Sequence, residues 1–109
     1  MTRKATQTNW VYILANRYNN AIYVGSTSDI IARIAQHKAR EIKGHTKKYN
    51  IDKLVYFERC DDMDLALKRE KQLKNWRRAW KNDLIKQSNP DWIDIYEKAI
   101  EDQKSVDWD

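Results

Sequence analysis

Three short runs of apolar and aromatic residues interrupt a chain that is otherwise strongly polar. They cover residues 10–15, 21–25 and 54–58, and each contains Val and Tyr among other apolar residues. Runs of this length and composition predict β-strands rather than helices. The polar loop of residues 16–20 separates the first two runs, so these are expected to form a β-hairpin.

Helical spacing of apolar residues appears in two other stretches. Residues 29–42 repeat isoleucine and alanine every three to four positions, directly after the capping sequence Thr27-Ser28-Asp29. A second helix is predicted from residue 61 to about 80, with a bent continuation to 85. Its apolar stripe is Met63, Ala66, Leu73, Trp76, Trp80 and Leu84. Asn89-Pro90 ends it, and residues 91–100 are expected to form a last short helix or turn.

These elements predict an α+β fold, sandwich-like, with a small three-stranded and mainly antiparallel sheet flanked by about three to five helices. The 109 residues allow one compact domain, which we expect to span residues 9–97. Residues 1–8 are expected to be a flexible N-terminus. Residues 98–109 are expected to be an acidic tail that frays.

Charge and cysteine content narrow the class of protein. The formal net charge is +5 and the isoelectric point about 9.3, which favours a nucleic acid or another polyanion as partner. A basic protein without such a partner is the alternative. Cys60 is the only cysteine, so an internal disulfide is excluded and a reducing, cytoplasmic setting is expected. The sequence contains no apolar run of membrane-spanning length, so no membrane association is expected.

Glu70 is the most informative residue of the second helix. It lies within the apolar stripe, between Ala66 and Leu73. Burying a carboxylate without a partner costs several kcal/mol, so Glu70 must meet a cation, a metal ion or a water-filled cleft. An ion pair with Arg33 or Arg77 is the purely structural alternative.

The predicted hairpin carries Tyr12 and Tyr23 on facing strands, and Gly25 ends the second strand. Gly25 suits a position of positive φ or of close backbone approach. Arg33 and His37 are four residues apart, so they share one face of the first helix, beside its apolar stripe. Taken singly, these residues fit sheet packing and a solvated helix face equally well.

Together these residues resemble the GIY-YIG nuclease domain. Trp10-Val11-Tyr12 stands in the first half of the name motif and Tyr23-Val24-Gly25 in the second. The resemblance continues to about residue 95 and is greatest to small stand-alone members related to the N-terminal domain of the excision-repair nuclease UvrC. It implies a β-β-α-β-α topology. Two positions depart from the pattern, because Trp10 replaces the first glycine and Ser26 stands where UvrC-type proteins tend to carry a lysine.

The resemblance also implies a set of catalytic residues: Tyr12, Tyr23, Arg33, His37, Glu70 and Asn82, with Asn75 as an alternative to Asn82. Glu70 would be the single protein ligand of Mg²⁺ or Mn²⁺, since such hard ions accept one carboxylate together with water and phosphate oxygens. Arg33 would contact the scissile phosphate. The base would be Tyr12 or Tyr23, acting directly or through His37, and the sequence does not choose between them.

The expected function is therefore metal-dependent hydrolysis of phosphodiester bonds in DNA, in DNA repair or processing. The sequence does not choose between structured, nicked and single-stranded DNA, and RNA is left open. Basic residues that could bind phosphates are Lys47, Lys48, Lys71, Lys74, Arg77 and Arg78. One alternative is a nucleic-acid-binding module with the same fold and little activity alone. Another is an interaction protein that uses Trp92 and Trp108. The oligomeric state, monomer or weak homodimer, stays open.

Overall fold

The sheet predicted from the three apolar runs is present, with strand order β2-β1-β3 and antiparallel pairing throughout. The structure is a computed structural model that describes residues 8–42 and 44–107. The strands are β1 (Asn9–Ala15), β2 (Ile22–Thr27) and β3 (Lys53–Cys60). The helices are α1 (Ile30–Lys38), α2 (His45–Lys48), α3 (Met63–Asn75), α4 (Arg78–Ser88) and α5 (Tyr96–Asp107). The predicted α+β class is thus confirmed, while the expected flexible N-terminus lies, except for Thr8, outside the described residues.

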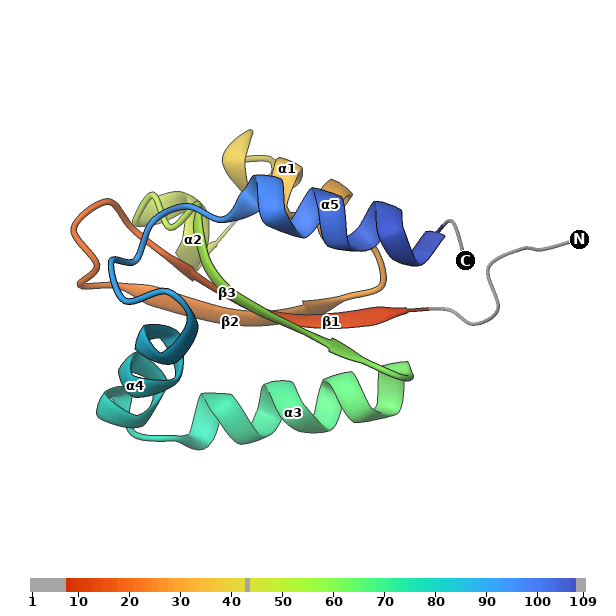
Figure 1. Ribbon diagram of the computed structural model, residues 1–109. Coiled ribbons are helices and arrows are strands. Elements are labelled where there is room, and N and C mark those ends of the chain that lie inside the picture. The colour runs from red at the N-terminus through yellow and green to blue at the C-terminus, as the bar shows by residue number, and fades with distance from the viewer. Residues whose placement is uncertain (1–7, 43, 108–109) are drawn as a thin grey trace, which may run out of the picture.

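Helices cover both faces of this sheet. Figure 1 shows α1, α2 and α5 on one side of the strands and α3 and α4 on the other. Every residue of β1 is buried, because this strand is central in the sheet and both of its faces are covered. No helix of the described residues is long and apolar enough to cross a membrane.

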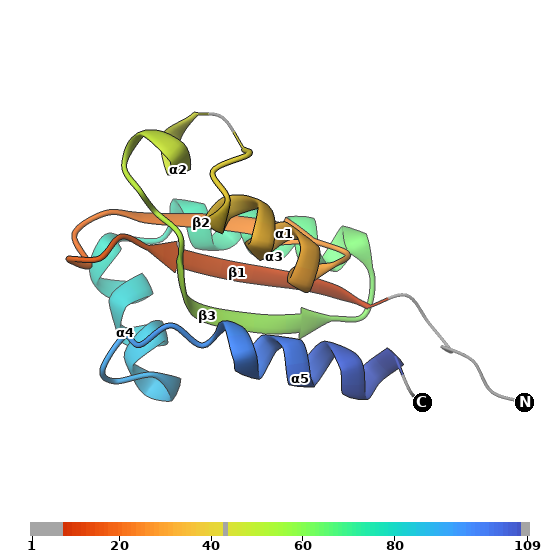
Figure 2. The ribbon, with the colours of Figure 1, turned by 90° about the horizontal axis from the view of Figure 1, so that it is seen from above.

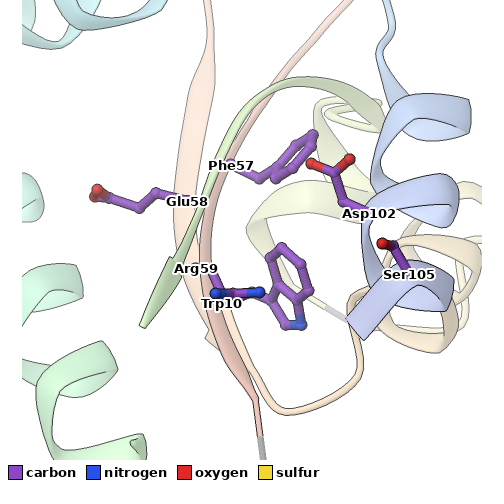
Figure 3. Close-up of a pocket in the computed structure, with 6 residues that line it drawn as sticks. All are labelled: Trp10, Phe57, Glu58, Arg59, Asp102 and Ser105. Atoms are coloured by element: carbon purple, nitrogen blue, oxygen red, sulfur yellow. The ribbon is translucent and has the colours of Figure 1, made fainter. Parts of the chain in front are cut away.

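Alternation along β1 divides the core in two. Trp10, Tyr12 and Leu14 pack with Ile30 and Ile34 of α1. On the opposite face, Val11 and Ile13 belong to a second cluster with Ala66, Leu73 and Ile85 of the other two helices. The same alternation in β3 is visible in Figure 3, where Phe57 and Glu58 point to opposite sides of the sheet.

Gly25 is required by close approach rather than by positive φ. It lies opposite Tyr12 in the β1–β2 register. A Cβ atom at this position would lie 2.5 Å from the Tyr12 hydroxyl oxygen and 2.6 Å from the ring carbon that bears it. The glycine therefore makes room for the Tyr12 side chain on the face of the sheet that α1 covers.

The helical predictions need three corrections. The expected 29–42 helix begins at its Asp29 cap but ends at Lys38, and Arg40 then adopts a positive φ of 60°. The single helix expected over residues 61–85 is two helices, because Trp76 and Arg77 are extended, each with ψ of 152°. The basic loop of residues 43–50 contains the short helix α2.

The C-terminal prediction differs most from the structure. Residues 98–107 were expected to belong to a fraying acidic tail, yet α5 continues to Asp107. The buried Ala99 packs against the core, and the Gln103 side chain binds the start of α1. Its Oε1 accepts from the Ile30 backbone N–H at 2.8 Å, and its Nε2 donates to Asp29 at 3.1 Å. A polar side chain thus anchors this helix, which an apolar periodicity does not reveal.

Gly25→Ala should destabilise the fold by about 1–3 kcal/mol, because the new methyl group overlaps the Tyr12 ring in a closely packed layer. Urea unfolding followed by circular dichroism would measure the loss. Ser28→Ala, an exposed change three residues away, is the control and should stay within about 0.5 kcal/mol of the parent. An unfolding free energy equal to that of the parent for Gly25→Ala would contradict this account.

Candidate active site

A buried tyrosine–histidine pair forms the centre of the site. The Tyr12 hydroxyl lies 3.0 Å from His37 Nε2, and both residues are almost fully buried. The other ring nitrogen, Nδ1, lies 3.3 Å from the hydroxyl oxygen of Thr46 on α2. Because that oxygen can accept from Nδ1–H, the arrangement favours an Nε2 lone pair that accepts the Tyr12 proton. Thr46 was missed by the sequence reasoning, and no pattern in its polar loop distinguishes it.

Tyr23 completes a cluster of three rings. Its ring centroid lies 5.6 Å from that of His37 and 6.3 Å from that of Tyr12. Tyr23 is only half-buried, whereas Tyr12 has 1% of its surface exposed. A substrate can therefore meet Tyr23, while Tyr12 is shielded from it.

Burial sets the protonation of the pair. Burial raises the pKa of Tyr12 well above its usual value, and Tyr23 and Glu70 add to this, while Arg33 opposes it. Burial and the Arg33 charge lower the pKa of His37 to about 4. Near neutral pH both side chains are thus uncharged, the hydroxyl as donor and the imidazole as acceptor.

Arg33 lies on α1 beside this cluster. Its guanidinium donates to Gln36 at 3.3 Å. Among the residues that the structure describes, Arg33 takes part in no ion pair. The guanidinium thus keeps donors that a phosphate could use. His37 was expected at the boundary between core and solvent but is 4% exposed, so of these two residues only Arg33 is half-buried.

Glu70 is paired, although not with the arginines expected from the sequence. One carboxylate oxygen accepts from the Ser26 hydroxyl at 2.5 Å, and the other lies 2.6 Å from Lys74 Nζ. The Lys74 ammonium also lies 5.7 Å from the centroid of the Tyr23 ring. Lys74 therefore connects the carboxylate on α3 to the ring cluster under α1.

The two halves of the site meet at the outer edge of β2. This strand pairs only with β1, so its other edge is free of the sheet. Figure 2 shows β2 at the margin of the sheet, with α1 in front of the strands and α3 behind them. Tyr23 and Ser26 point to opposite faces of β2, which explains how residues of α1 and α3 reach one place.

The donor set near Glu70 suits a hard cation held by one protein ligand. The carboxylate lines an open hollow of about 340 Å³ together with Leu67, Lys71, Lys74 and Asn75. The described residues contain no group of three or more His, Cys, Asp or Glu side chains that could form a cage. Mg²⁺ commonly binds through one or two carboxylates, with water and substrate phosphates as its other ligands. Glu70 could supply such a carboxylate if the ion replaced the Lys74 ammonium, which lies 2.6 Å from one of its oxygens.

The two candidate asparagines lie in different surroundings. Asn75 lines the hollow beside Glu70. Asn82 accepts from Arg78 Nε at 2.9 Å, and Arg78 in turn donates to the carbonyls of Asn19 and Asn20 in the hairpin turn. Asn75 therefore shares the hollow of the carboxylate, whereas Asn82 is not among the residues that line it.

The predicted phosphate-binding residues are all exposed but do not form a single cluster. Lys71 and Lys74 line the Glu70 hollow, and Arg77 and Arg78 follow at the junction of α3 and α4. Lys47 and Lys48 lie on α2, on the other side of the sheet.

A different hollow, of about 390 Å³, lies between β3 and α5 (Figure 3). Its walls are Trp10, Phe57, Glu58, Arg59, Asp102 and Ser105. Trp10 stands where the family motif has its first glycine, and its ring packs edge-on against Phe57 at 5.8 Å. None of the predicted site residues lines this hollow, so it is separate from the Tyr12–Glu70 site.

Comparisons with known proteins identify the family of the chain. The family model described as the GIY-YIG catalytic domain matches residues 8–83. A UPF0213 protein of Syntrophus aciditrophicus is 39% identical over 84 residues, which cover 76% of this chain and 94% of that protein. A UPF0213 protein of Natronomonas pharaonis is 32% identical over 77 residues, covering 71% and 89%.

The fold has a solved counterpart as well. The solution NMR structure of a UPF0213 protein from Bacillus halodurans matches with a TM-score of 0.51 and 24% identity, over 78% of this chain and 89% of that one. The segment matched by the family model runs from β1 through the hairpin, α1 and Glu70 into α4. The chain therefore belongs to the GIY-YIG catalytic domain family.

Proposed function

We propose that the protein is a metal-dependent endonuclease that hydrolyses phosphodiester bonds in DNA. The observation that carries the proposal is the pairing of the Tyr12–Tyr23–His37 cluster with the Glu70 carboxylate across the free edge of β2. Lys74 contacts both parts. Membership of a catalytic-domain family supports a nuclease. The proposed setting is DNA processing or repair in the cytoplasm, where the lone Cys60 stays reduced.

Exposure separates the roles of the two tyrosines. Tyr23 is half-buried and lies close to the Lys74 ammonium. We therefore assign to Tyr23 the contact with the substrate or the attacking water. Tyr12 is shielded and bonded to His37, so it acts as a positioning residue that holds His37 and the Tyr23 ring in place. Arg33 stabilises the charge that develops on the phosphate.

Glu70 is the residue that would hold a divalent cation. Such an ion, when bound, supplies Lewis-acid stabilisation of the phosphate oxygens. Ser26 orients the carboxylate through its hydroxyl. Lys74 and Lys71 line the same hollow and offer ammonium groups to the phosphates on either side of the cleaved bond.

Glu70→Gln should lower the rate of cleavage by about 100-fold or more. The neutral amide is a poor ligand for the cation, which is expected to stabilise the charge of the transition state by several kcal/mol. The measurement is cleavage of labelled duplex, nicked, branched and single-stranded DNA and of RNA, with Mg²⁺, Mn²⁺ or EDTA. Glu97→Gln, an exposed change on α5, is the matched control and should retain parental activity. Parental cutting by Glu70→Gln, or cutting in EDTA, would refute the metal role. Salt-sensitive binding without any cutting would favour a binding module instead.

The two tyrosines should respond unequally to loss of their hydroxyl groups. Tyr23→Phe should slow single-turnover cleavage by about 10²–10⁴-fold, the range for loss of a group that transfers a proton. Tyr12→Phe should slow it by only about tenfold, the equivalent of one hydrogen bond of about 1 kcal/mol. The opposite order would assign the proton transfer to Tyr12.

The buried His37 should make the fold less stable in mild acid. Its pKa is about 4 in the folded protein, against about 6.5 when unfolded. The unfolded chain therefore binds more protons in this window, so stability is full above pH 6.5 and falls as the pH drops towards 4, by up to about 3 kcal/mol. Urea unfolding at several pH values, compared between the parent and His37→Asn, isolates this loss. If the unfolding free energy of the two proteins fell with pH in the same way, His37 would not be the cause of the acid destabilisation.

A further inference from the structure

The positive charge of the protein is concentrated in one segment. Residues 71–82 contain five basic and no acidic residues, which equals the net charge of +5 of the whole chain. The same twelve residues hold two of the five tryptophans, Trp76 and Trp80. Proteins that bind single-stranded nucleic acids commonly combine basic side chains with aromatic side chains on which the bases stack.

Trp80 is exposed, contrary to its place in the predicted apolar stripe. Half of its surface, 50%, is open, whereas Trp76 is partly buried against the core cluster under the sheet. The extended backbone at Trp76 and Arg77 causes the difference, because it ends α3 and restarts the helix with a new orientation. On α4, Ile85 is the residue that faces the core.

The tryptophan and arginine side chains at this junction are ordered against one another. The rings of Trp76 and Trp80 pack edge-to-face, with centroids 6.1 Å apart. The Arg77 guanidinium lies 5.4 Å from the centroid of the Trp80 ring, and that of Arg69 lies 5.3 Å from the Trp76 ring. Trp80 is thus held by an aromatic neighbour and a cation while much of its ring stays open to a ligand.

The basic segment of residues 71–82 extends to the candidate active site. Lys81, next to Trp80, donates to the Lys74 backbone carbonyl at 3.5 Å. Lys74 is the residue whose ammonium contacts Glu70 and the Tyr23 ring. A strand that follows the basic segment from Trp80 would therefore arrive at the Glu70 hollow.

We propose that Trp80, with Arg77, stacks an unpaired base, and that the substrates of this protein carry a single-stranded segment. The inference rests on the proposed nuclease function and narrows its substrate class. Stacking requires an open base face, which a duplex presents only at its ends. The five basic residues of the segment favour a polyanion over a protein partner as the ligand, although Glu70 and Asp83 flank the segment.

The test measures binding in EDTA, where hydrolysis does not interfere, by fluorescence anisotropy of a labelled 20-nucleotide strand and of its duplex. Trp80→Ala should weaken binding of the single strand by about 5- to 150-fold, the effect of one stacked base, and change duplex binding by less than about twofold. Trp80→Phe should restore most of the affinity. Tyr18→Ala is the matched control, since Tyr18 is 73% exposed and also lies under an arginine, Arg17, at 5.4 Å.

Salt dependence separates stacking from charge. Trp80→Ala removes no charge, so the slope of log K against log salt should equal that of the parent. Arg77→Gln should reduce this slope for the single strand by about 0.7, the value for one phosphate contact. Equal weakening of both nucleic acids by Trp80→Ala, or no weakening, would overturn the stacking role. Parent protein that binds neither nucleic acid would refute the proposed function itself, and the inference with it.

Discussion

The complete burial of β1 is the constraint on which the rest of the structure depends. Because helices cover both faces of the sheet, each side chain of this strand must find a partner on one side or the other. For most positions the partner is apolar, but Tyr12 brings a hydroxyl group into the interior. That hydroxyl must be hydrogen-bonded, since an unpaired polar group in this layer would cost about 1–3 kcal/mol. His37 meets the requirement, and the fold thereby fixes an imidazole beside the second tyrosine.

The charged part of the site, Glu70 with Lys74, lies outside the interior that holds Tyr12 and His37. Glu70 cannot share the interior with the Tyr12–His37 pair without a large desolvation cost. It lies instead beyond the edge of β2, where Ser26 and Lys74 satisfy its two oxygens and a hollow leaves it open to solvent. The strand edge therefore joins two environments, a buried one that keeps side chains neutral and a solvent-open one that holds the charged Glu70 and Lys74.

The sequence predicted those features that follow from local pattern. The hairpin, the Asp29 cap and the close approach at Gly25 depend on neighbouring residues, and they appear as expected. Tyr12, Tyr23 and His37 also come together as the motif spacing implied. Contacts between segments far apart in the chain were not predictable in this way.

Two such contacts show why, and a third contact, which is local, was missed because the sequence reasoning looked for an arginine. Thr46 reaches His37 only because the fold brings α2 close to α1, and nothing in its own sequence neighbourhood distinguishes it. Gln103 anchors α5 through hydrogen bonds, which leave no apolar period to detect. Lys74 rather than Arg33 or Arg77 pairs with Glu70, because position i+4 on the same helix needs no tertiary arrangement and the arginines face other groups.

The break between α3 and α4 shows how a small backbone change alters the surface that a partner would meet. A continuous helix would have kept Trp80 in register with Leu73 and Trp76 and buried it. Two extended residues instead turn Trp80 outward, where its ring meets Arg77 and Trp76. An exposed tryptophan loses the free energy of burial, and Trp80 regains only part of it from Trp76 and Arg77. The same break therefore places an open indole face next to a guanidinium, which is the arrangement from which the stacking role of Trp80 is inferred.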